Sequence, residues 1–590
     1  MRKILFILAL ALFLPLSCHA EALNPPLVSH MEAEVVQKGS VELTGPADML
    51  IINMTIPQED QYQKVRIDYA SSDYKIVKDS LGNSLLTMTF INPGSRAEYE
   101  VRSTVTVDRR LSASVPEAKE FRLPSALIQS DDPRIIGLAE NITVGQTSAF
   151  AKVALVSKWV HENIKYDLSP KYADANLSAL ATLDNKAGVC DEFSSLVIAA
   201  GRSIGYPSAY SVGYAYGRGY RIAEDFVPHG WAEVCTPEGC WPSDSTWAET
   251  GFVDATHIKF ATLVDSYFPE VTATARGATS IKVNPTEIRI TILNFKEEPL
   301  IRTENTLLKD RLWNGYAVMR TDMSTSGCVL TNVVSKSCVN EGREFFQALE
   351  PEKIVYFCGS KSVYSIYKLP ESLNRNIRYT CELISYPYAG EDKRQSVVLD
   401  SKEGAGEKVS LAVDKTTLVP GEKFTALSPG AWLFTDYGRE ALDRAEWYAP
   451  SEDFRVYAYS KGSLAAQDMR VVISKPFELA VSADRQNITL GGNATLTAEV
   501  RNLLGSEQVI RLSVSGRERT LTVPAGATDS AEFVFIPQSV DDNVAQVVAS
   551  SSSFSTSSSV RFNVAEEKGV FGFLEGIFAA IAKFFEGFFG

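Results

Sequence analysis

The chain has 590 residues and a formal net charge of -14, with 45% hydrophobic and 22% charged residues. That length exceeds what one hydrophobic core supports, and the composition is typical of globular rather than disordered or fibrous protein. The acidic balance argues against nucleic acid as a partner, because binding to a phosphate backbone requires a basic face. We therefore expect several globular domains and no nucleic-acid partner.

Residues 1–20 have the pattern of an export signal. Two basic residues precede an apolar run over 4–16, and small residues end at Ala20, where we expect cleavage. The run is shorter than the roughly 20 apolar residues that a membrane span needs. A lipoprotein site at Cys18 is the alternative, although the three residues before it match that motif poorly. The sequence thus predicts an exported protein, extracellular or at the cell surface.

Export makes the cysteine count informative, because oxidising compartments favour disulfides. Of the eight cysteines, Cys18 lies in the leader, and an odd number remains. Cys235 and Cys240 flank a turn sequence and are expected to pair. A later cluster allows two bridges in any of three connectivities, and its members are Cys328, Cys338, Cys358 and Cys381. Cys190 is then the unpaired thiol.

The chain changes its hydrophobic period near residue 130. Residues 25–125 carry short alternating apolar runs between Gly, Asn and Pro, which predicts an antiparallel β domain. Helical spacing then predicts a helix over 148–164, capped by Ser or Thr, and a second helix that starts near Cys190. Three consecutive strands follow these helices. Residues 130–275 are therefore predicted to form an α+β domain.

The remaining chain is predicted to be β-rich up to its final segment. We expect a disulfide-containing β domain over 283–405, a further β module over 406–475 and an immunoglobulin-like sandwich over 476–565. Between residues 568 and 590, apolar and aromatic side chains fall opposite a thin charged stripe at helical spacing. Such a C-terminal amphipathic helix suits a membrane surface, and packing on a neighbouring domain or self-association is the alternative.

Five Asn-x-Ser/Thr sequons permit surface glycosylation in a host that has the machinery. They begin at Asn53, Asn141, Asn176, Asn487 and Asn493. The motif is short, so some of these matches are expected by chance.

Three residues of the central domain have the chemistry of a nucleophilic triad. Cys190 stands where a helix should begin, and a helix N-terminus favours the thiolate. If Cys235 bonds Cys240, the strands around them form a hairpin in which His229 and Asp244 are diagonal neighbours on one face. A carboxylate in that place orients the histidine and stabilises its charged form. Taken alone, a cysteine or a strand histidine is more often structural than catalytic.

The motifs around these residues occur in a characteristic order. They read GVCDE over 188–192, HGWAEV over 229–234 and WPSDSTW over 241–247. Over about 148–250 the chain resembles the transglutaminase-like superfamily, whose members share a papain-like α+β fold. The resemblance implies Cys190 as nucleophile, His229 as general base and acid, and Asp244 as the residue that orients the histidine. Ser245 departs from the family, whose usual members have proline after the acid.

The resemblance implies cysteine acyl transfer on protein or peptide amides through a thioester, as a peptidase or amidase or as a transglutaminase. We favour hydrolysis. The Cys190 backbone N–H, or a side chain near Trp159 or Tyr166, is the candidate oxyanion donor. No cofactor is expected; relatives often use calcium, but the sequence has no EF-hand loop. A protein or peptide substrate and a membrane surface are the expected partners.

Two other classes of function remain open. A zinc ion could gather Cys190, His229, Asp244, Cys235 and Cys240, although the last two are widely spaced for a metal site and export favours a disulfide between them. The second alternative is a non-catalytic cell-surface binding scaffold, because a fold alone never guarantees an activity.

Overall fold

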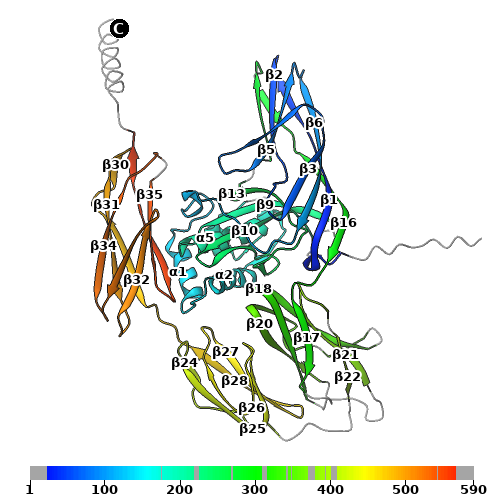
Figure 1. The fold of residues 1–590 in the computed structure, drawn as a ribbon, viewed down its shortest axis with the longest axis vertical. Helices are drawn as coiled ribbons and strands as arrows, with labels where there is room; N and C mark the ends of the chain where they lie inside the picture. The colour runs from blue at the N-terminus through cyan, green and yellow to red at the C-terminus, as the bar shows by residue number, and fades with distance from the viewer. Residues whose placement is uncertain are drawn as a thin grey trace, which may run out of the picture.

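The computed structural model describes most of the chain between residues 23 and 566. The described ranges are 23–173, 176–217, 225–267, 270–278, 280–308, 315–340, 343–346, 348–369, 379–392, 394–399, 408–540 and 543–566. The predicted signal segment at 1–20 and the predicted helix at 568–590 lie outside them. The described chain is mostly β-structure, with a mixed helical and β core at its centre and β-rich parts around it (Figure 1).

The N-terminal part is a sandwich of two antiparallel sheets (Figure 1). Apolar side chains alternate along its strands and meet between the sheets, where Leu50 and Ile52 of the second sheet share one core with Val41 and Tyr99 of the first. The first sheet contains β1 (Val28–Thr44), β3 (Gln63–Ala70), β6 (Arg96–Asp108), β15 (Ser280–Val283) and β16 (Glu287–Glu297). The second sheet contains β2 (Met49–Thr55), β4 (Tyr74–Lys78), β5 (Ser84–Ile91) and β14 (Val271–Arg276).

This sandwich includes a segment that the sequence placed elsewhere. Residues 271–297 were predicted to end the central domain and begin the next, but β14 pairs with β2, and β15 and β16 pair with β1. The physical reason lies in β1, whose buried side chains make it a central strand. It needs a partner on both edges, and β6 supplies only one of them.

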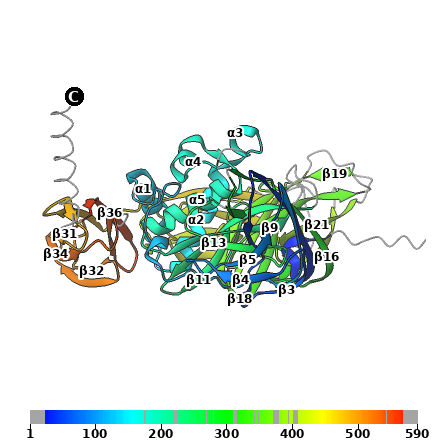
Figure 2. The same ribbon diagram turned by 90° about the horizontal axis from the view of Figure 1, so that it is seen from above.

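The core of residues 130–263 packs its helices against a sheet of order β13-β9-β10-β11-β12. Helix α5 crosses β9 and β10 (Figure 1), and in the view from above the helices gather on one side of the core (Figure 2). The helices are η2 (Lys119–Phe121), α1 (Pro133–Thr143), α2 (Ala149–Asn163), α3 (Pro170–Ala173), α4 (Ala179–Asn185) and α5 (Cys190–Ser203), and η1 (Pro25–Leu27) precedes the first sandwich. The strands are β7 (Lys165–Tyr166), β8 (Ala187–Gly188), β9 (Ser208–Tyr216), β10 (Phe226–Thr236), β11 (Gly239–Asp244), β12 (Glu249–Thr250) and β13 (Ile258–Leu263).

The core sheet continues into the disulfide-containing segment. Thr250 of β12 pairs with Leu330 of β18, so one sheet runs from β13 to β22. Cys328 and Cys358 form a disulfide between β18 and β20. The side chains of Cys338 and Cys381 lie outside the described part, and a bridge between them stays a prediction. The strands are β17 (Arg302–Leu307), β18 (Tyr316–Asn340), β19 (Arg343–Phe346), β20 (Glu352–Lys368), β21 (Tyr379–Pro387) and β22 (Arg394–Leu399).

Two further β-rich parts complete the described chain. The first contains β23 (Ala412–Val413), β24 (Thr417–Leu418), β25 (Lys423–Thr435), β26 (Glu440–Tyr448), β27 (Phe454–Ser460) and β28 (Ser463–Val471). The second is a sandwich that contains β29 (Phe477–Ala483), β30 (Asn487–Thr489), β31 (Ala494–Asn502), β32 (Gln508–Val514), β33 (Arg517–Val523), β34 (Thr528–Phe535), β35 (Val544–Ser550), β36 (Ser555–Arg561) and β37 (Asn563–Ala565). Within the described residues, no helix is both long enough and apolar enough to cross a membrane.

The five sequons differ in how they are placed. Asn141, Asn487 and Asn493 are exposed. Asn53 is half-buried and accepts a hydrogen bond from the Thr87 hydroxyl, and the side chain of Asn176 accepts one from Ser266. Glycosylation at any of the five stays a prediction, and the three exposed positions are the more accessible ones.

Candidate active site

Cys190 is the first residue of α5, as the sequence predicted. The Glu192 carboxylate fixes this helix start: Oε2 accepts from the Val189 N–H at 2.8 Å, and Oε1 accepts from the Leu177 N–H at 2.7 Å. Gly188 allows the approach, because a Cβ there would lie 2.5 Å from the Cβ of Glu192. Cys190 is partly exposed, and among the described cysteines it is the free one. Its thiol and backbone N–H therefore stand at the end of α5 where N–H groups lack helical acceptors.

Strand β10 carries His229, whose side chain is almost completely buried. The strand needs glycine at the next position, because a Cβ on Gly230 would lie 1.9 Å from the Tyr210 hydroxyl oxygen. The Trp247 ring stacks on the imidazole at a centroid distance of 4.3 Å and an angle of 14°. Burial and the stacked Trp247 ring thus restrict the orientation of the imidazole.

Strand β11 carries Asp244 in the hairpin that the sequence predicted. Cys235 and Cys240 are directly opposite and form a disulfide. His229 Nε2 lies 2.8 Å from Asp244 Oδ2, and Asp244 Oδ1 accepts from the Thr246 N–H at 2.9 Å. The diagonal placement of the two side chains is therefore as predicted. The hairpin turn also holds α2, because Glu238 accepts from the Ala149 N–H at 2.8 Å.

The turn after Asp244 has serine where usual family members have proline. Helix α2 secures this turn, since His161 Nδ1 donates to the Ser245 carbonyl oxygen at 2.8 Å. This hydrogen bond holds the backbone at Ser245, the position at which a proline ring would restrict the backbone φ angle. Ser245 therefore leaves the carboxylate of Asp244 in contact with His229.

The electrostatics of the site favour a charged histidine. Burial opposes the charged form, but the charge and hydrogen bond of Asp244, with a smaller effect of the Cys190 thiol, raise the pKa of His229 to about 9. Burial also opposes ionisation of Asp244, yet His229 and then His257 hold its pKa far below the usual range. Because Nε2 of His229 faces Asp244, its Nδ1 is the nitrogen left for the thiol. The arrangement can support an imidazolium beside a thiolate.

Acidic and aromatic side chains surround the nucleophile. Burial raises the pKa of Asp191, and burial together with the charge of Asp191 raises the pKa of Glu192 to about 7. The Tyr166 ring packs edge-on against Phe193 at 5.8 Å. The Trp159 ring carries the Lys186 ammonium 4.4 Å from its centroid. Neither aromatic residue is thereby established as an oxyanion donor, and the Cys190 N–H at the helix start stays the better-placed candidate.

The structure adds His257, which sequence reasoning missed. His257 precedes β13, is completely buried, and its Nε2 lies 3.3 Å from the same Asp244 oxygen that contacts His229. Its Nδ1 faces Asp254, at 3.2 Å from the carbonyl oxygen and 3.6 Å from a carboxylate oxygen. The sequence feature that could have pointed to His257 is the low number of histidines, since the chain has only five. Nothing in the local pattern connected this one to the acid.

These contacts bear on metal binding. Two buried sets have ligand atoms close enough together to hold an ion, namely His229, Asp244 and His257, and Glu249, Asp254 and His257. In each set His257 already contacts one of the acids, Asp244 at 3.3 Å and Asp254 at 3.6 Å. The zinc set suggested by the sequence is wrong in one respect: Cys235 and Cys240 are joined in a disulfide and offer no thiolate.

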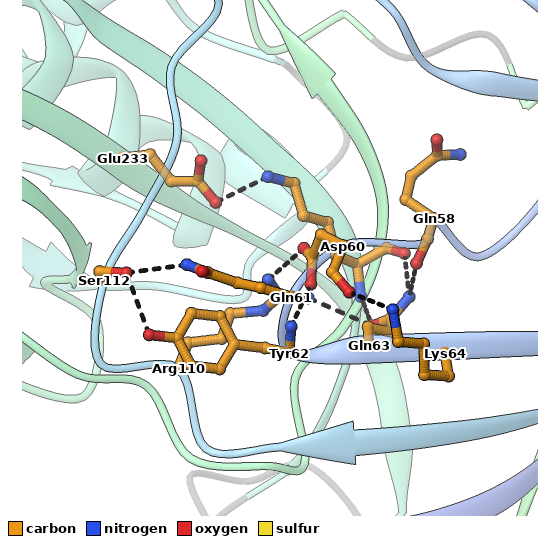
Figure 3. A network of polar contacts seen from close by, with 10 residues as sticks. Gln58, Asp60, Gln61, Tyr62, Gln63, Lys64, Arg110, Ser112 and Glu233 are labelled. Atoms are coloured by element: carbon orange, nitrogen blue, oxygen red, sulfur yellow. Dashed lines mark hydrogen bonds and ion pairs between the residues drawn. The ribbon is translucent and has the colours of Figure 1, made fainter.

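The N-terminal sandwich reaches this region through a buried polar network (Figure 3). Lys259 of β13 pairs with Glu233 of β10 at 2.7 Å, and its backbone N–H donates to Gln63 at 2.9 Å. Gln63 in turn donates to the Lys259 and Gln58 carbonyls, at 2.8 and 2.7 Å. Beside them Arg110 pairs with Asp60. Strand β13 is thus hydrogen-bonded to the first sandwich, and its Lys259 side chain reaches β10, the strand that carries His229.

Comparison with known proteins gives one family. Residues 136–246 match the Transglutaminase-like superfamily, and this segment contains Cys190, His229 and Asp244. No curated protein matches the sequence.

Solved structures give distant likenesses. A "Putative Cysteine Protease from Cytophaga hutchinsonii" is 18% identical with a TM-score of 0.35, over 46% of this chain and 93% of that one. The red sea bream transglutaminase is 8% identical with a TM-score of 0.19, over 88% and 92%. The N-terminal four Ig domains of Dscam1 isoform 6.9 are 10% identical with a TM-score of 0.22, over 61% and 92%.

Proposed function

Residues 136–246 are a transglutaminase-like core, and on that premise we propose that the protein is a cysteine acyl-transfer enzyme for protein or peptide amides. Cys190 is the nucleophile, His229 the general base and acid, and Asp244 the residue that orients His229. The observation that carries this proposal is the 2.8 Å contact between a buried histidine and a buried carboxylate, beside a free thiol at a helix start.

Acylation follows from the charge state of the site. The Cys190 thiolate attacks the amide carbonyl carbon, and the electrons of the C=O bond move to oxygen, which the Cys190 N–H can stabilise. The intermediate collapses, the C–N bond breaks, and the leaving amine takes the Nδ1 proton of His229. The products are a thioester on Cys190, a free amine and a neutral imidazole, which Asp244 keeps in place.

Deacylation reverses these roles. A water molecule or a lysine amine attacks the thioester, and the neutral His229 removes its proton. Cys190 leaves as a thiolate and His229 is again an imidazolium. Attack by water gives hydrolysis and attack by an amine gives transamidation, and the same three residues serve both. We favour hydrolysis, so that the protein acts as a peptidase or amidase.

Two features support an extracellular setting for this activity. The disulfides Cys235–Cys240 and Cys328–Cys358 are consistent with an oxidising compartment. The signal pattern at 1–20 supports export, and the amphipathic pattern at 568–590 supports association with a membrane surface. We propose that the enzyme acts on proteins or peptides outside the cytoplasm, without a bound cofactor.

Alkylation of the folded, full-length protein tests the site without a known substrate. Iodoacetamide labelling across pH, read by mass spectrometry at each cysteine, should modify Cys190 rapidly at neutral pH. His229→Asn should slow this reaction, whereas His30→Asn, a matched change in the first sandwich, should not. A Cys190 that resists labelling in the folded protein would favour the non-catalytic scaffold.

Activity is then measured on peptide libraries, with and without a primary amine as acceptor. Cys190→Ala should lower the rate by about a thousandfold or more, as for removal of other nucleophiles. Release of shortened peptides would identify hydrolysis, and incorporation of the amine would identify transamidation. A Cys190→Ala protein with full activity would exclude the mechanism.

A further inference from the structure

We propose that His257 is a positioning residue for Asp244, holding the acid of the triad through the same carboxylate oxygen that contacts His229. This inference rests on the proposed function, since it assigns a role toward the same nucleophile. Asp244 Oδ2 receives His229 Nε2 at 2.8 Å and His257 Nε2 at 3.3 Å, and Oδ1 receives the Thr246 N–H at 2.9 Å. The carboxylate thus has three donors arranged around it, and two of them are imidazoles.

The hydrogen-bonding partners of His257 determine where its protons are. A carboxylate and a carbonyl oxygen only accept, so the contact with Asp244 requires a proton on Nε2. The contact of Nδ1 with the Asp254 carbonyl oxygen requires a second proton, which makes the ring an imidazolium. A cation here is matched by the carboxylates of Asp244 and Asp254, and Arg109 and Glu249 are the next charged groups around Asp254.

The His257 ring has no freedom to leave this position. It meets Trp231 and Trp247 edge-on, at centroid distances of 5.2 and 5.4 Å, and His229 at 5.6 Å. Both the imidazole and its two acidic partners are completely buried. Trp247 is shared, because it stacks on His229 and meets His257 with its edge. Packing therefore fixes the two histidines relative to each other as well as to Asp244.

The backbone around His257 is anchored by the first sandwich. Val253 and Arg110 exchange backbone hydrogen bonds at 3.0 Å, and the Ala255 N–H donates to the Val28 carbonyl at 3.0 Å. On the other side of His257, Lys259 is held by Gln58 and Gln63. The position of the acid consequently depends on contacts made by residues far outside the segment that matches the family.

Two substitutions of His257 distinguish a role in positioning Asp244 from a role in packing alone. In His257→Gln the terminal amide can place an N–H near the former Nε2, and so preserve the bond to Asp244. In His257→Asn the shorter amide reaches only toward Asp254. The measurement is the rate of Cys190 alkylation by iodoacetamide at pH 7 in the full chain, with the thermal unfolding midpoint of each variant.

We expect His257→Asn to slow alkylation about tenfold, as loss of an orienting outer partner does elsewhere, and His257→Gln to recover most of the rate. Equal rates for His257→Asn and wild type would overturn the proposal, as would equal losses in both variants at equal unfolding midpoints. If His229→Asn leaves the rate unchanged, the proposed function itself fails, whatever His257 does. A wild-type rate that falls with EDTA and returns with zinc would replace the proposal with a metal at His257.

A measurement on the unaltered protein guards against variants that do not fold. Labelling the histidine rings with ¹⁵N gives few signals, because the sequence has five histidines. At pH 7 we expect the His257 ring to carry a proton on Nε2, with the nitrogen shifts of an imidazolium. A ring without a proton on Nε2 would overturn the proposal.

Discussion

The two sandwiches at the ends of the described chain meet the core through different kinds of contact. The N-terminal one covers the buried Lys259–Glu233 pair of β13 and β10, and its Gln63 amide and Gln58 backbone N–H both donate to the Lys259 carbonyl. The C-terminal one meets the ends of α1 and α5, where Ser555 donates to the Ile204 carbonyl at 2.9 Å. Its ion pair Arg561–Asp131, and the pair Lys475–Glu140 made by the residue just before it, each include a basic side chain that is substantially exposed to solvent.

The difference separates a sandwich that is joined to the candidate active-site region from one that is only attached beside the core. Buried charges and amides tolerate few arrangements, because each unsatisfied group costs free energy, so the N-terminal contact fixes one geometry. Exposed pairs contribute little, and the contact at α1 and α5 lies away from Cys190, His229 and Asp244. We expect substitutions at the N-terminal contact to alter the candidate active site. Substitutions at the C-terminal contact should alter only how the C-terminal sandwich packs on the core.

The largest effect is expected from Lys259→Met. This change leaves the Glu233 carboxylate buried without its partner, which should lower the free energy of unfolding of the core by about 3–5 kcal/mol. Hydrogen exchange of β10 and β13 measures the loss. Adding Glu233→Leu should restore most of it, since a buried pair can be replaced by apolar side chains. If Lys259→Met proved as mild as the Arg561 variant below, the distinction between the buried polar network and the exposed C-terminal ion pairs would be lost.

Raising the pH should weaken the core and spare the C-terminal sandwich. The pKa values of His229 and His257 are raised to about 9 from an ordinary 6.5. A histidine whose pKa is raised in the folded state stabilises the fold fully below about pH 6.5, and this stabilisation is lost as the pH rises through 9. The free energy of unfolding should then fall by roughly 2 kcal/mol or more. The sandwich over 476–566 has no histidine. Urea unfolding at pH 6 and pH 9.5, followed by hydrogen exchange in each part, should show loss in the core alone.

Gly205→Ala should loosen the C-terminal contact by about 1 kcal/mol beyond its backbone cost. Gly205 has φ +88°, and a Cβ there would lie 2.7 Å from a Val548 methyl carbon. Gly516→Ala is the matched control, with φ +80° and no neighbour within 4 Å. Faster hydrogen exchange in β36 is expected for the first variant only, with the Cys190 alkylation rate unchanged in both. Slower alkylation in Gly205→Ala would mean that this contact, too, reaches the site.

The smallest effect is expected from Arg561→Ala. Because the Arg561 side chain is 66% exposed, its pair with Asp131 should contribute at most about 1 kcal/mol, and less at high salt. Thermal unfolding of the C-terminal sandwich at low and high ionic strength measures this contribution. A salt-independent loss of several kcal/mol would show that this contact is as tightly built as the N-terminal one.

Local patterns in the sequence predicted much of the site. The register of the β10–β11 hairpin followed from one cysteine pair, and the start of α5 at Cys190 followed from the change in period after Gly188. Both features depend on residues close together in the chain. The contact of His229 with Asp244 could therefore be expected before the structure, although catalysis by these residues stays a proposal.

What the sequence did not predict depends on contacts between distant segments. The place of His257 depends on a bulge between Lys259 and Ala261 in β13, and on hydrogen bonds to the first sandwich. The assignment of 271–297 to that sandwich depends on pairing with β1 and β2. Alternation within a strand tells which side chains are buried, but not which strand lies beside it.

The pairing of β1 also has a consequence for synthesis of the chain. Val28 pairs with Glu297, so β1 leaves the ribosome before the whole core, and its second edge is covered only after the core has been synthesised. Until then, an apolar strand with an open edge is exposed to aggregation or to chaperones. Residues 271–297 are therefore the last segment to pair with the other strands of the sandwich. A nascent chain that stops short of residue 297 would therefore lack a closed sandwich.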